Sequence, residues 1–432
     1  MTATLLFTLF IVAMLIGVPI GAALGLAGTV AIAIANASIP WMGLLAVPQN
    51  FFAGLGKYTL LAVPMFVLVG SIFDRSGVAA RLVNFAVAIV GRGPGMLPLV
   101  AIAVAMFLGG ISGSGPANAA AVGGVMIAAM SRAGYPPSFS ASVVGAAAAT
   151  DILIPPSVAF IIYSVLVPGA SVPALFAAGM VPGVLAGLAL IIPAVWMARR
   201  HHMGALEADM PRPPFWQSLR EASWGLAAPV LILGGMRAGW FTPTEAAVVA
   251  VFYGLFVGMV IHRTIRWRDL FDILREAGEL SAVILLVVSL AGIFAFSLST
   301  LGVIDPVADA IVNSGLGEYG VLLLLILLLI TVGMFLDGIS IFLIFVPLLM
   351  PIMEHYQWDP VWFGVILTLK VALGQFTPPL AVNLMVSCRI AGVRMESTVR
   401  WVWPMLLAMG AVMLLVIAFP QLALWLPAKL GY

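Results

Sequence analysis

Long apolar segments recur along the chain and are separated by short polar connections. The clearest of them cover residues 174–198, 243–261, 280–300, 318–336 and 404–427. Helices of this length can cross the roughly 30 Å hydrocarbon core of a bilayer. The first apolar segment, 5–35, is too long for a signal peptide and lacks a basic start, so we count it as part of the fold. The pattern predicts an all-α polytopic membrane protein.

Composition agrees with this fold class and narrows the function. The 432 residues are 63% hydrophobic and 8% charged, whereas about a quarter of the residues in a soluble domain are charged. The single cysteine, Cys388, allows no internal disulfide. The sequence has no His, Cys, Asp or Glu cluster with metal-ligand spacing and no G-x-x-x-x-G-K-[ST] motif. We therefore expect neither an enzyme nor an ATPase, and a net charge of +2 gives no support for a nucleic-acid partner.

The two halves of the chain carry similar motifs in the same order. MFLGGIS at 106–112 returns as MFLDGIS at 334–340, 228 positions later, and Ile154-Pro155-Pro156 returns as Thr377-Pro378-Pro379, 223 positions later. A nearly constant shift in a very apolar chain indicates two structural repeats. Paired repeats with Gly or Pro breaks at corresponding places are typical of secondary transporters, whose binding sites lie at the breaks.

The positions of the arginines predict the topology. Fifteen of the 19 basic residues fall in five connections: Arg75, Arg81 and Arg92; Arg132; Arg199, Arg200, Arg212 and Arg220; Arg263, Arg266, Arg268 and Arg275; Arg389, Arg394 and Arg400. The positive-inside rule places these connections in the cytoplasm and leaves both chain ends outside. Segments 93–131 and 318–354 then begin and end on the same side of the membrane. We interpret them as re-entrant helical hairpins that enter from opposite sides, which makes the two repeats inverted in topology.

Each half is expected to contain the same series of elements. Two helices (4–16 and 22–37; 222–238 and 243–262) precede a lateral arm (41–55; 266–277), a third helix (58–73; 279–300), a short helix (78–90; 303–313) and the hairpin. A Pro-Pro-broken helix (138–165; 361–388) and a closing helix (174–198; 401–427) complete the unit. Gly17, Gly21 and Gly25 form a small-xxx-small stripe, which predicts close helix packing.

The two Pro-Pro breaks are the strongest candidates for a binding site. Each proline removes a helical hydrogen bond, so the carbonyls at 151–154 and 374–377 need other donors or a cation. Oxygen ligands suit a hard cation such as Na⁺, and unwound carbonyls are a recurring Na⁺ site in transporters. The hairpin tips would add further ligands: Ser112, Gly113, Ser114 and Asn118 in the first, and Asp337, Gly338 and Ser340 in the second. The alternative is that the prolines only kink packed helices.

An anionic substrate would suit the helix N-termini that follow the breaks. These begin at Ser157 and Leu380, where free N–H groups and the positive end of the helix dipole attract negative charge. The candidate substrate-binding residues are therefore Ser114, Asn118, Pro155, Ser157, Pro378 and Asn383.

Ionisable residues at membrane depth are functional candidates. Asp151 precedes the first Pro-Pro pair, and Asp337 lies on the second hairpin tip, where it would either act in binding or cap the tip. We interpret Lys370, inside the second broken helix, as a satisfied structural charge. Glu245 is expected to cap the helix after Pro243, together with Thr242 or Thr244.

With these motifs the chain resembles, over essentially its whole length, the large membrane subunit of the TRAP (tripartite ATP-independent periplasmic) transporters. The resemblance rests on three segments and the end of the chain: Gly113-Ser114 through Gly123, Met130 and Gly134-Tyr135; Ile154-Pro155-Pro156-Ser157, Leu175-Phe176 and Gly179-Met180-Val181-Pro182-Gly183; Phe335-Leu336-Asp337, Pro347, Pro351, Asp359-Pro360, Phe363-Gly364, Gly374 through Pro379 and Asn383; and Leu424-Trp425-Leu426-Pro427.

The resemblance implies a Na⁺-driven elevator mechanism in a bacterial inner membrane, with both termini periplasmic. The implied division is a scaffold with arms (1–77 and 222–302), a transport domain (78–198 and 303–427) and a cytoplasmic loop (199–221). Carbonyls would bind one Na⁺ at Asp151, Ile154 and Pro156 and another at Gly374, Thr377 and Pro379. The implied partners are a small four-helix membrane subunit, expected as a separate chain, and a periplasmic protein that delivers an organic acid.

Two departures from the family pattern concern the substrate. Asp151 stands where the family usually has glycine, so its carboxylate could add a ligand, titrate or alter the substrate. The first tip reads Ser114-Gly115-Pro116-Ala117-Asn118, where many members are richer in Thr and Ala. A self-sufficient Na⁺/anion symporter with similar inverted hairpins is the first alternative. A channel or a membrane-embedded enzyme is the second.

Overall fold

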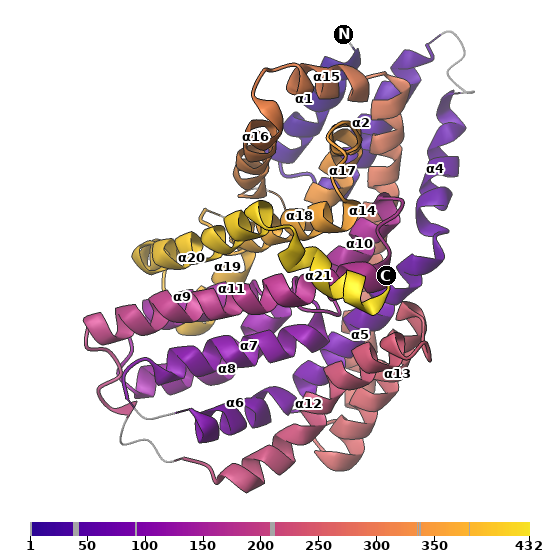
Figure 1. The fold of residues 1–432 in the computed structure, drawn as a ribbon. Helices are drawn as coiled ribbons and strands as arrows, with labels where there is room; N and C mark the ends of the chain where they lie inside the picture. Colours follow the sequence, from indigo (N-terminus) through magenta and orange to yellow (C-terminus); the bar gives the residue numbers. More distant parts are fainter. Residues whose placement is uncertain are drawn as a thin grey trace.

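The computed structural model describes residues 2–37, 43–90, 93–207, 212–334, 336, 338–379 and 381–432, and all regular structure in these ranges is helical (Figure 1). Six of the described helical segments are long and apolar enough to cross a membrane. The predicted all-α polytopic fold class is therefore confirmed.

The first half of the chain contains ten α-helices and one short 3₁₀-helix in the described residues. They are α1 (Thr2–Leu15), α2 (Ile20–Ala35), α4 (Ala46–Leu55), η1 (Tyr58–Leu61), α5 (Ala62–Arg75), α6 (Val78–Ile89), α7 (Met96–Ser112), α8 (Gly115–Arg132), α9 (Pro137–Ala148), α10 (Val158–Leu166) and α11 (Val172–Arg200). The sequence between α9 and α10 contains the first Pro-Pro pair, so the predicted broken helix is a pair of short helices.

The second half follows a similar order. Its described elements are α12 (Phe215–Arg237), α13 (Pro243–Phe256), the π-helical turn η3 (Val257–Ile261), α14 (Asp269–Thr300), α15 (Ile304–Val312), α16 (Gly317–Gly333), α17 (Gly338–His355), α18 (Pro360–Gly374), α19 (Val382–Ala391), η4 (Met395–Thr398), α20 (Val399–Ala418) and α21 (Gln421–Leu430). α13 begins with a capping box in which Thr242 and Glu245 bond each other's backbone N–H, as expected for Glu245.

A tight turn joins α7 to α8 and produces the first helical hairpin. Gly113 has φ +61°, a left-handed conformation that ends α7 and that glycine adopts without steric cost. Ser114 is extended, and α8 starts again at Gly115. The two helices pack on each other along their length. The second pair, α16 and α17, has its break at 334–337, of which Phe335 and Asp337 lie outside the described residues.

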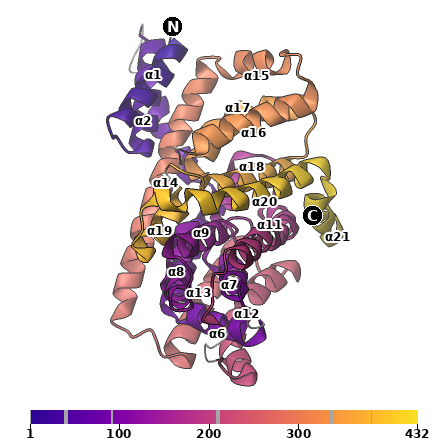
Figure 2. The same cartoon turned by 90° about the vertical axis from the view of Figure 1, so that its left-hand side faces the viewer.

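The predicted boundary between the second arm and the third helix is wrong. α14 continues from Asp269 to Thr300, a length of about 48 Å at 1.5 Å per residue, and it runs along most of the height of the molecule (Figure 2). Gly278 separates the predicted arm from the predicted helix, but one glycine costs a helix only about 1 kcal/mol. An ion pair between Arg275 and Glu279 bridges the supposed boundary at 2.8 Å.

The predicted closing helix 401–427 is also interrupted. α20 ends at Ala418 because Pro420 has no N–H to donate to the carbonyl of Val416. The indole Nε1 of Trp362 donates to that carbonyl instead, at 2.9 Å. A side chain of α18 thus satisfies the end of α20.

The predicted polar loop 199–221 is shorter than expected and partly buried. α11 continues to Arg200, and α12 already begins at Phe215. Glu207 is only 7% exposed. Its carboxylate accepts hydrogen bonds from the Leu97 N–H at 2.8 Å and the Tyr135 hydroxyl at 2.5 Å, and thereby caps the start of α7. Burial raises the pKa of Glu207, although these hydrogen bonds oppose the rise.

Glycines on α2 bring the two halves of the chain together. A Cβ on Gly21 would lie 3.0 Å from Val287 Cγ2, and one on Gly25 would lie 2.6 Å from Leu290 Cδ2. α2 therefore packs closely on α14, as the small-xxx-small stripe predicted for Gly21 and Gly25.

Candidate functional site

A cavity of about 450 Å³ lies where the two hairpin tips and the two broken helices meet. Its walls come from the first tip (113–117), the start of α10, the second tip, and the end of α18 with the start of α19. α5, α14 and Ile20 supply the rest of its described wall. The structure thus brings together four segments that are far apart in the sequence.

The first Pro-Pro break satisfies one of its freed carbonyls internally. In an unbroken helix the carbonyl of Ile152 would accept from residue 156, but Pro156 has no N–H. The hydroxyl of Ser157 donates to Ile152 O instead, at 2.6 Å, and Ser157 is fully buried. Ser157, predicted as a substrate ligand, therefore holds the break in shape and does not line the cavity.

At the second Pro-Pro break, different groups donate hydrogen bonds to the backbone carbonyls. The carbonyl of Gln375 would need an N–H at Pro379, and the N–H of Asn383 donates to it at 3.0 Å. The Thr377 hydroxyl donates to Leu373 O at 2.6 Å. Both peptide bonds Pro155-Pro156 and Pro378-Pro379 are cis. Some of the freed carbonyls therefore have protein donors. The sequence had left open whether these carbonyls are satisfied by protein donors or by a cation.

The first hairpin tip lies against the carbonyls of the first break. A Cβ on Gly113 would be 2.9 Å from Pro156 O, and one on Gly110 would be 3.3 Å from Pro155 O. Both proline carbonyls therefore face the first hairpin tip, as the ligands of a cation bound at that tip would have to. Ser114 lines the cavity, whereas the side chain of Ser112 lies outside the described residues.

Asn118 does not point to the cavity. Its Nδ2 donates to Ala105 O at 2.8 Å and ties α8 to α7, and it is 1% exposed. Asn383 is also buried; its Nδ2 donates to Gln375 Oε1 at 2.9 Å, and a Cβ on Gly115 would lie 2.8 Å from either amide atom. The predicted substrate ligands Asn118 and Asn383 thus hold the walls of the cavity in place.

The second tip is less completely described. Gly338 and Gly374 line the cavity, and a Cβ on Gly374 would be 3.0 Å from Gly333 O. Ser340 is 1% exposed on α17. Asp337, predicted as a ligand, lies outside the described residues. The described cavity wall does not include six other residues that the sequence predicted as ligands: Ile154, Thr377, Pro155, Pro156, Pro378 and Pro379.

Two fully buried ionisable residues lie beside the hairpins. Asp151 is 0% exposed and packs on Gly109 of α7, whose Cβ would be 3.0 Å from Asp151 Oδ1. Lys370 is 0% exposed on α18, and its Nζ has no hydrogen-bond partner among the described residues. The interpretation of Lys370 as a satisfied charge is therefore wrong.

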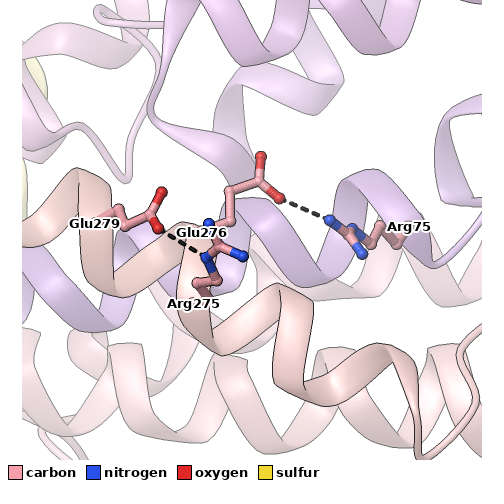
Figure 3. Close-up of polar contacts among 4 residues, drawn as sticks. All are labelled: Arg75, Arg275, Glu276 and Glu279. Atoms are coloured by element: carbon pink, nitrogen blue, oxygen red, sulfur yellow. Dashed lines mark hydrogen bonds and ion pairs between the residues drawn. The ribbon is translucent and has the colours of Figure 1, made fainter.

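The sequence missed two acidic residues of the cavity wall, Asp74 on α5 and Glu276 on α14. Glu276 pairs with Arg75 at 2.9 Å and so joins the two helices (Figure 3). The pattern showed these residues only as charges near predicted cytoplasmic helix ends. Nothing in it indicated that α5 and α14 would face the hairpin tips.

Comparison with known proteins identifies the relatives of this chain. The family model described as "Tripartite ATP-independent periplasmic transporter, DctM component" matches residues 7–422. The C4-dicarboxylate TRAP transporter large permease protein DctM of Rhodobacter capsulatus is 34% identical, with both chains covered completely. The isethionate TRAP transporter permease protein DctMQ of Oleidesulfovibrio alaskensis is 36% identical over 97% of this chain, which spans 65% of the length of that relative.

A solved structure has the same fold. The YdaH transporter of Alcanivorax borkumensis matches with a TM-score of 0.60 over 94% of this chain and 100% of that one. Sequence identity is 13%, so the likeness concerns the fold alone.

Proposed function

The chain belongs to the DctM component family of the tripartite ATP-independent periplasmic transporters, and from this premise we propose that it is the large permease of a Na⁺-driven importer of an organic acid. It is a multi-pass membrane transporter and not an enzyme. The observation that carries the proposal is that both hairpin tips and both broken helices contribute described residues to the wall of one cavity. The expected location is the bacterial inner membrane.

The cavity suits an organic anion through backbone dipoles. Its described lining residues include no lysine, arginine or histidine but do include Asp74 and Glu276, so an anion must bind through backbone groups away from these two carboxylates. α8, α10 and α19 begin at or near its wall, at Gly115, Val158 and Val382. The first N–H groups of α8 and α10 have no partner within their own helices and carry partial positive charge, so a carboxylate or sulfonate can bind there, whereas the Asn383 N–H of α19 already donates to Gln375 O. The names of the relatives indicate two substrate classes to test first, a C4-dicarboxylate and isethionate.

Each hairpin tip with its break forms a cation position in this proposal. At the first, the carbonyls of Asp151, Ile154 and Pro156 would bind Na⁺ with Gly113. At the second, the candidates are Gly374, Thr377 and Pro379 with Gly338 and Ser340. Support comes from the tip-to-break contacts, Gly113 against Pro156 O and Gly333 O against Gly374.

We also propose transport by an elevator motion, which the same arrangement supports. The hairpins and broken helices would move as one body against α2, α5 and α14, which also contribute to the cavity wall. A small four-helix membrane subunit would support the static helices, and a periplasmic binding protein would deliver the substrate. The two halves would be inverted repeats.

Uptake into proteoliposomes tests the function. The chain is reconstituted with the small subunit, and the binding protein loaded with a C4-dicarboxylate or isethionate is added outside. We expect accumulation that requires an inward Na⁺ gradient and the binding protein. Undiminished uptake in Na⁺-free buffer with a proton gradient would refute the Na⁺ coupling, and equal uptake without the binding protein would favour a self-sufficient symporter.

Cysteine labelling tests the inverted topology. In a Cys388→Ala background, single cysteines replace Thr2, Leu206 and Gly431. The first and last should react with an impermeant reagent in intact spheroplasts, and the second only after permeabilisation. Protection of both terminal cysteines in intact cells would contradict the model.

A further inference from the structure

An open groove of about 680 Å³ lies between α7 and α11. Met96 and Leu99 of α7 form one wall, and α11 forms the other with lining residues that fall between Ile191 and Arg200. The lining is apolar except for Arg199 and Arg200, the last two residues of α11. The groove is separate from the cavity between the hairpin tips, because the two have no lining residue in common.

Two close contacts between α7 and α11 hold the groove in shape. At the start of α7, a Cβ on Gly95 would be 3.0 Å from Val195 Cγ1 and 3.2 Å from its Cα. Further along the pair, a Cβ on Gly187 would be 2.1 Å from Met106 Sδ. Small residues let membrane helices approach each other closely. The groove is therefore a fixed feature of how these two helices pack.

One face of α11 is apolar and exposed along the approach to the groove. Its exposed residues are Val184, Leu188, Ile192 and Trp196. Their spacing of four places them in one row, and Arg200 is the next position in that row. The row is about 18 Å long at 1.5 Å per residue, close to the roughly 15 Å of hydrocarbon in one leaflet. Because α11 is long and apolar enough to cross a membrane, this face meets lipid or another membrane protein.

The arginines at the end of the row suit a phosphate group. Arg199 and Arg200 are exposed, and neither takes part in an ion pair within the described residues. The guanidinium of Arg200 lies over the ring of Trp196, 4.8 Å from its centroid, which holds it at the end of the apolar row. Guanidinium groups bind phosphate oxygens in a bidentate manner, and tryptophan is enriched at the level of lipid headgroups. Both arginines also complement the dipole of α11, but the dipole does not explain why an apolar groove leads to them.

We propose that this groove binds one anionic phospholipid, whose phosphate lies on Arg199 and Arg200 and whose acyl chain lies against Leu99 and the apolar row of α11. Basic pockets between membrane helices bind anionic lipid headgroups in the same way. A lipid brings its own negative charge to the arginines. The small subunit is not the occupant, because in the proposed elevator it supports the static helices, and α11 is not one of them. The inference depends on the place of the chain in a membrane and not on Na⁺ coupling.

Native mass spectrometry of the purified full-length chain tests the inference. The protein in detergent is titrated with phosphatidylglycerol or with phosphatidylcholine of the same acyl chains, and Tm is measured in parallel. One phosphatidylglycerol should bind and raise Tm. Phosphatidylcholine should bind at least about tenfold more weakly, because its choline group brings a positive charge to the same arginines.

A double variant and a matched control locate the site. Arg199→Gln with Arg200→Gln should weaken phosphatidylglycerol binding by about 30-fold, since each basic residue near an anionic lipid surface contributes about fivefold. Arg266→Gln with Arg268→Gln removes the same charge from two exposed arginines that flank the exposed Trp267 outside the groove. We expect this control to bind phosphatidylglycerol as the wild type does.

Four results would overturn the inference. The first is equal affinity of the wild type for the two lipids, a measurement that needs no variant. The second is an equal loss of affinity in the two double variants. The third is binding of glycerol phosphate as tight as that of the lipid, which would make this a site for a soluble phosphate. The fourth is release of the lipid when the small subunit is added, which would make the groove a protein-docking face.

Discussion

Ser157→Ala is the sharpest test of how the first break is held together. Its hydroxyl replaces the N–H that Pro156 cannot give and donates to Ile152 O at 2.6 Å in a fully buried place. Alanine leaves that carbonyl buried without this donor. Leaving a buried polar group unsatisfied costs about 1–3 kcal/mol, which is about a 5- to 150-fold fall in the ratio of folded to unfolded protein.

Unfolding in mixed micelles with a rising fraction of denaturing detergent, followed by tryptophan fluorescence, measures this loss. Ser223→Ala is the matched control, because that hydroxyl also donates to a backbone carbonyl, Arg220 O at 2.8 Å, but is exposed. We expect the control to change the unfolding free energy by less than about 0.5 kcal/mol. If Ser157→Ala loses no more than Ser223→Ala, the hydroxyl does not hold the break.

Three further outcomes follow from the structure. Thr377→Val removes the hydroxyl that donates to Leu373 O and should lower the unfolding free energy by about 0.5–1.5 kcal/mol, because that carbonyl still accepts from the Phe376 N–H; Na⁺ affinity should stay unchanged, and a weaker affinity would instead make the hydroxyl a Na⁺ ligand. Because burial raises the pKa of Glu207 above its usual value of about 4.3, its contribution to stability is complete below that pH and is lost as the pH rises through the folded pKa. The Tm of the wild type minus that of Glu207→Gln should therefore fall from about pH 4 upward, and a constant difference would contradict this. Arg75→Ala breaks a half-exposed ion pair with Glu276 and should lower the unfolding free energy, measured by denaturant titration, by less than about 1 kcal/mol. A larger loss would mean that the pair holds α5 and α14 together.

Local features of the sequence were enough for most elements. Apolar segments of membrane-spanning length predicted the helices, since burial in lipid leaves a helix few alternatives. The Pro-Pro pairs predicted the breaks after α9 and α18, because a missing N–H acts on its own turn. Gly113 likewise ends α7 through its own backbone conformation.

Several local predictions failed where a distant group decided the outcome. The interruption at Pro420 is stabilised by Trp362 from another helix. Segment 199–221 was predicted as a loop, but Glu207 within it is buried, where its carboxylate accepts hydrogen bonds from the Leu97 N–H and the Tyr135 hydroxyl. The predicted boundary between segments 266–277 and 279–300 is absent because α14 continues through Gly278.

The sequence by itself determined which residues form helices and where the helices break, because these depend on neighbours within one or two turns. Only the tertiary structure decided which broken ends share a cavity, that Asp74 and Glu276 face it, and that Ser157 and Asn383 hold its walls together. It also decided that Lys370 lies without a partner among the described residues against Gly333. These facts depend on contacts between segments far apart in the chain, and no local pattern encodes them.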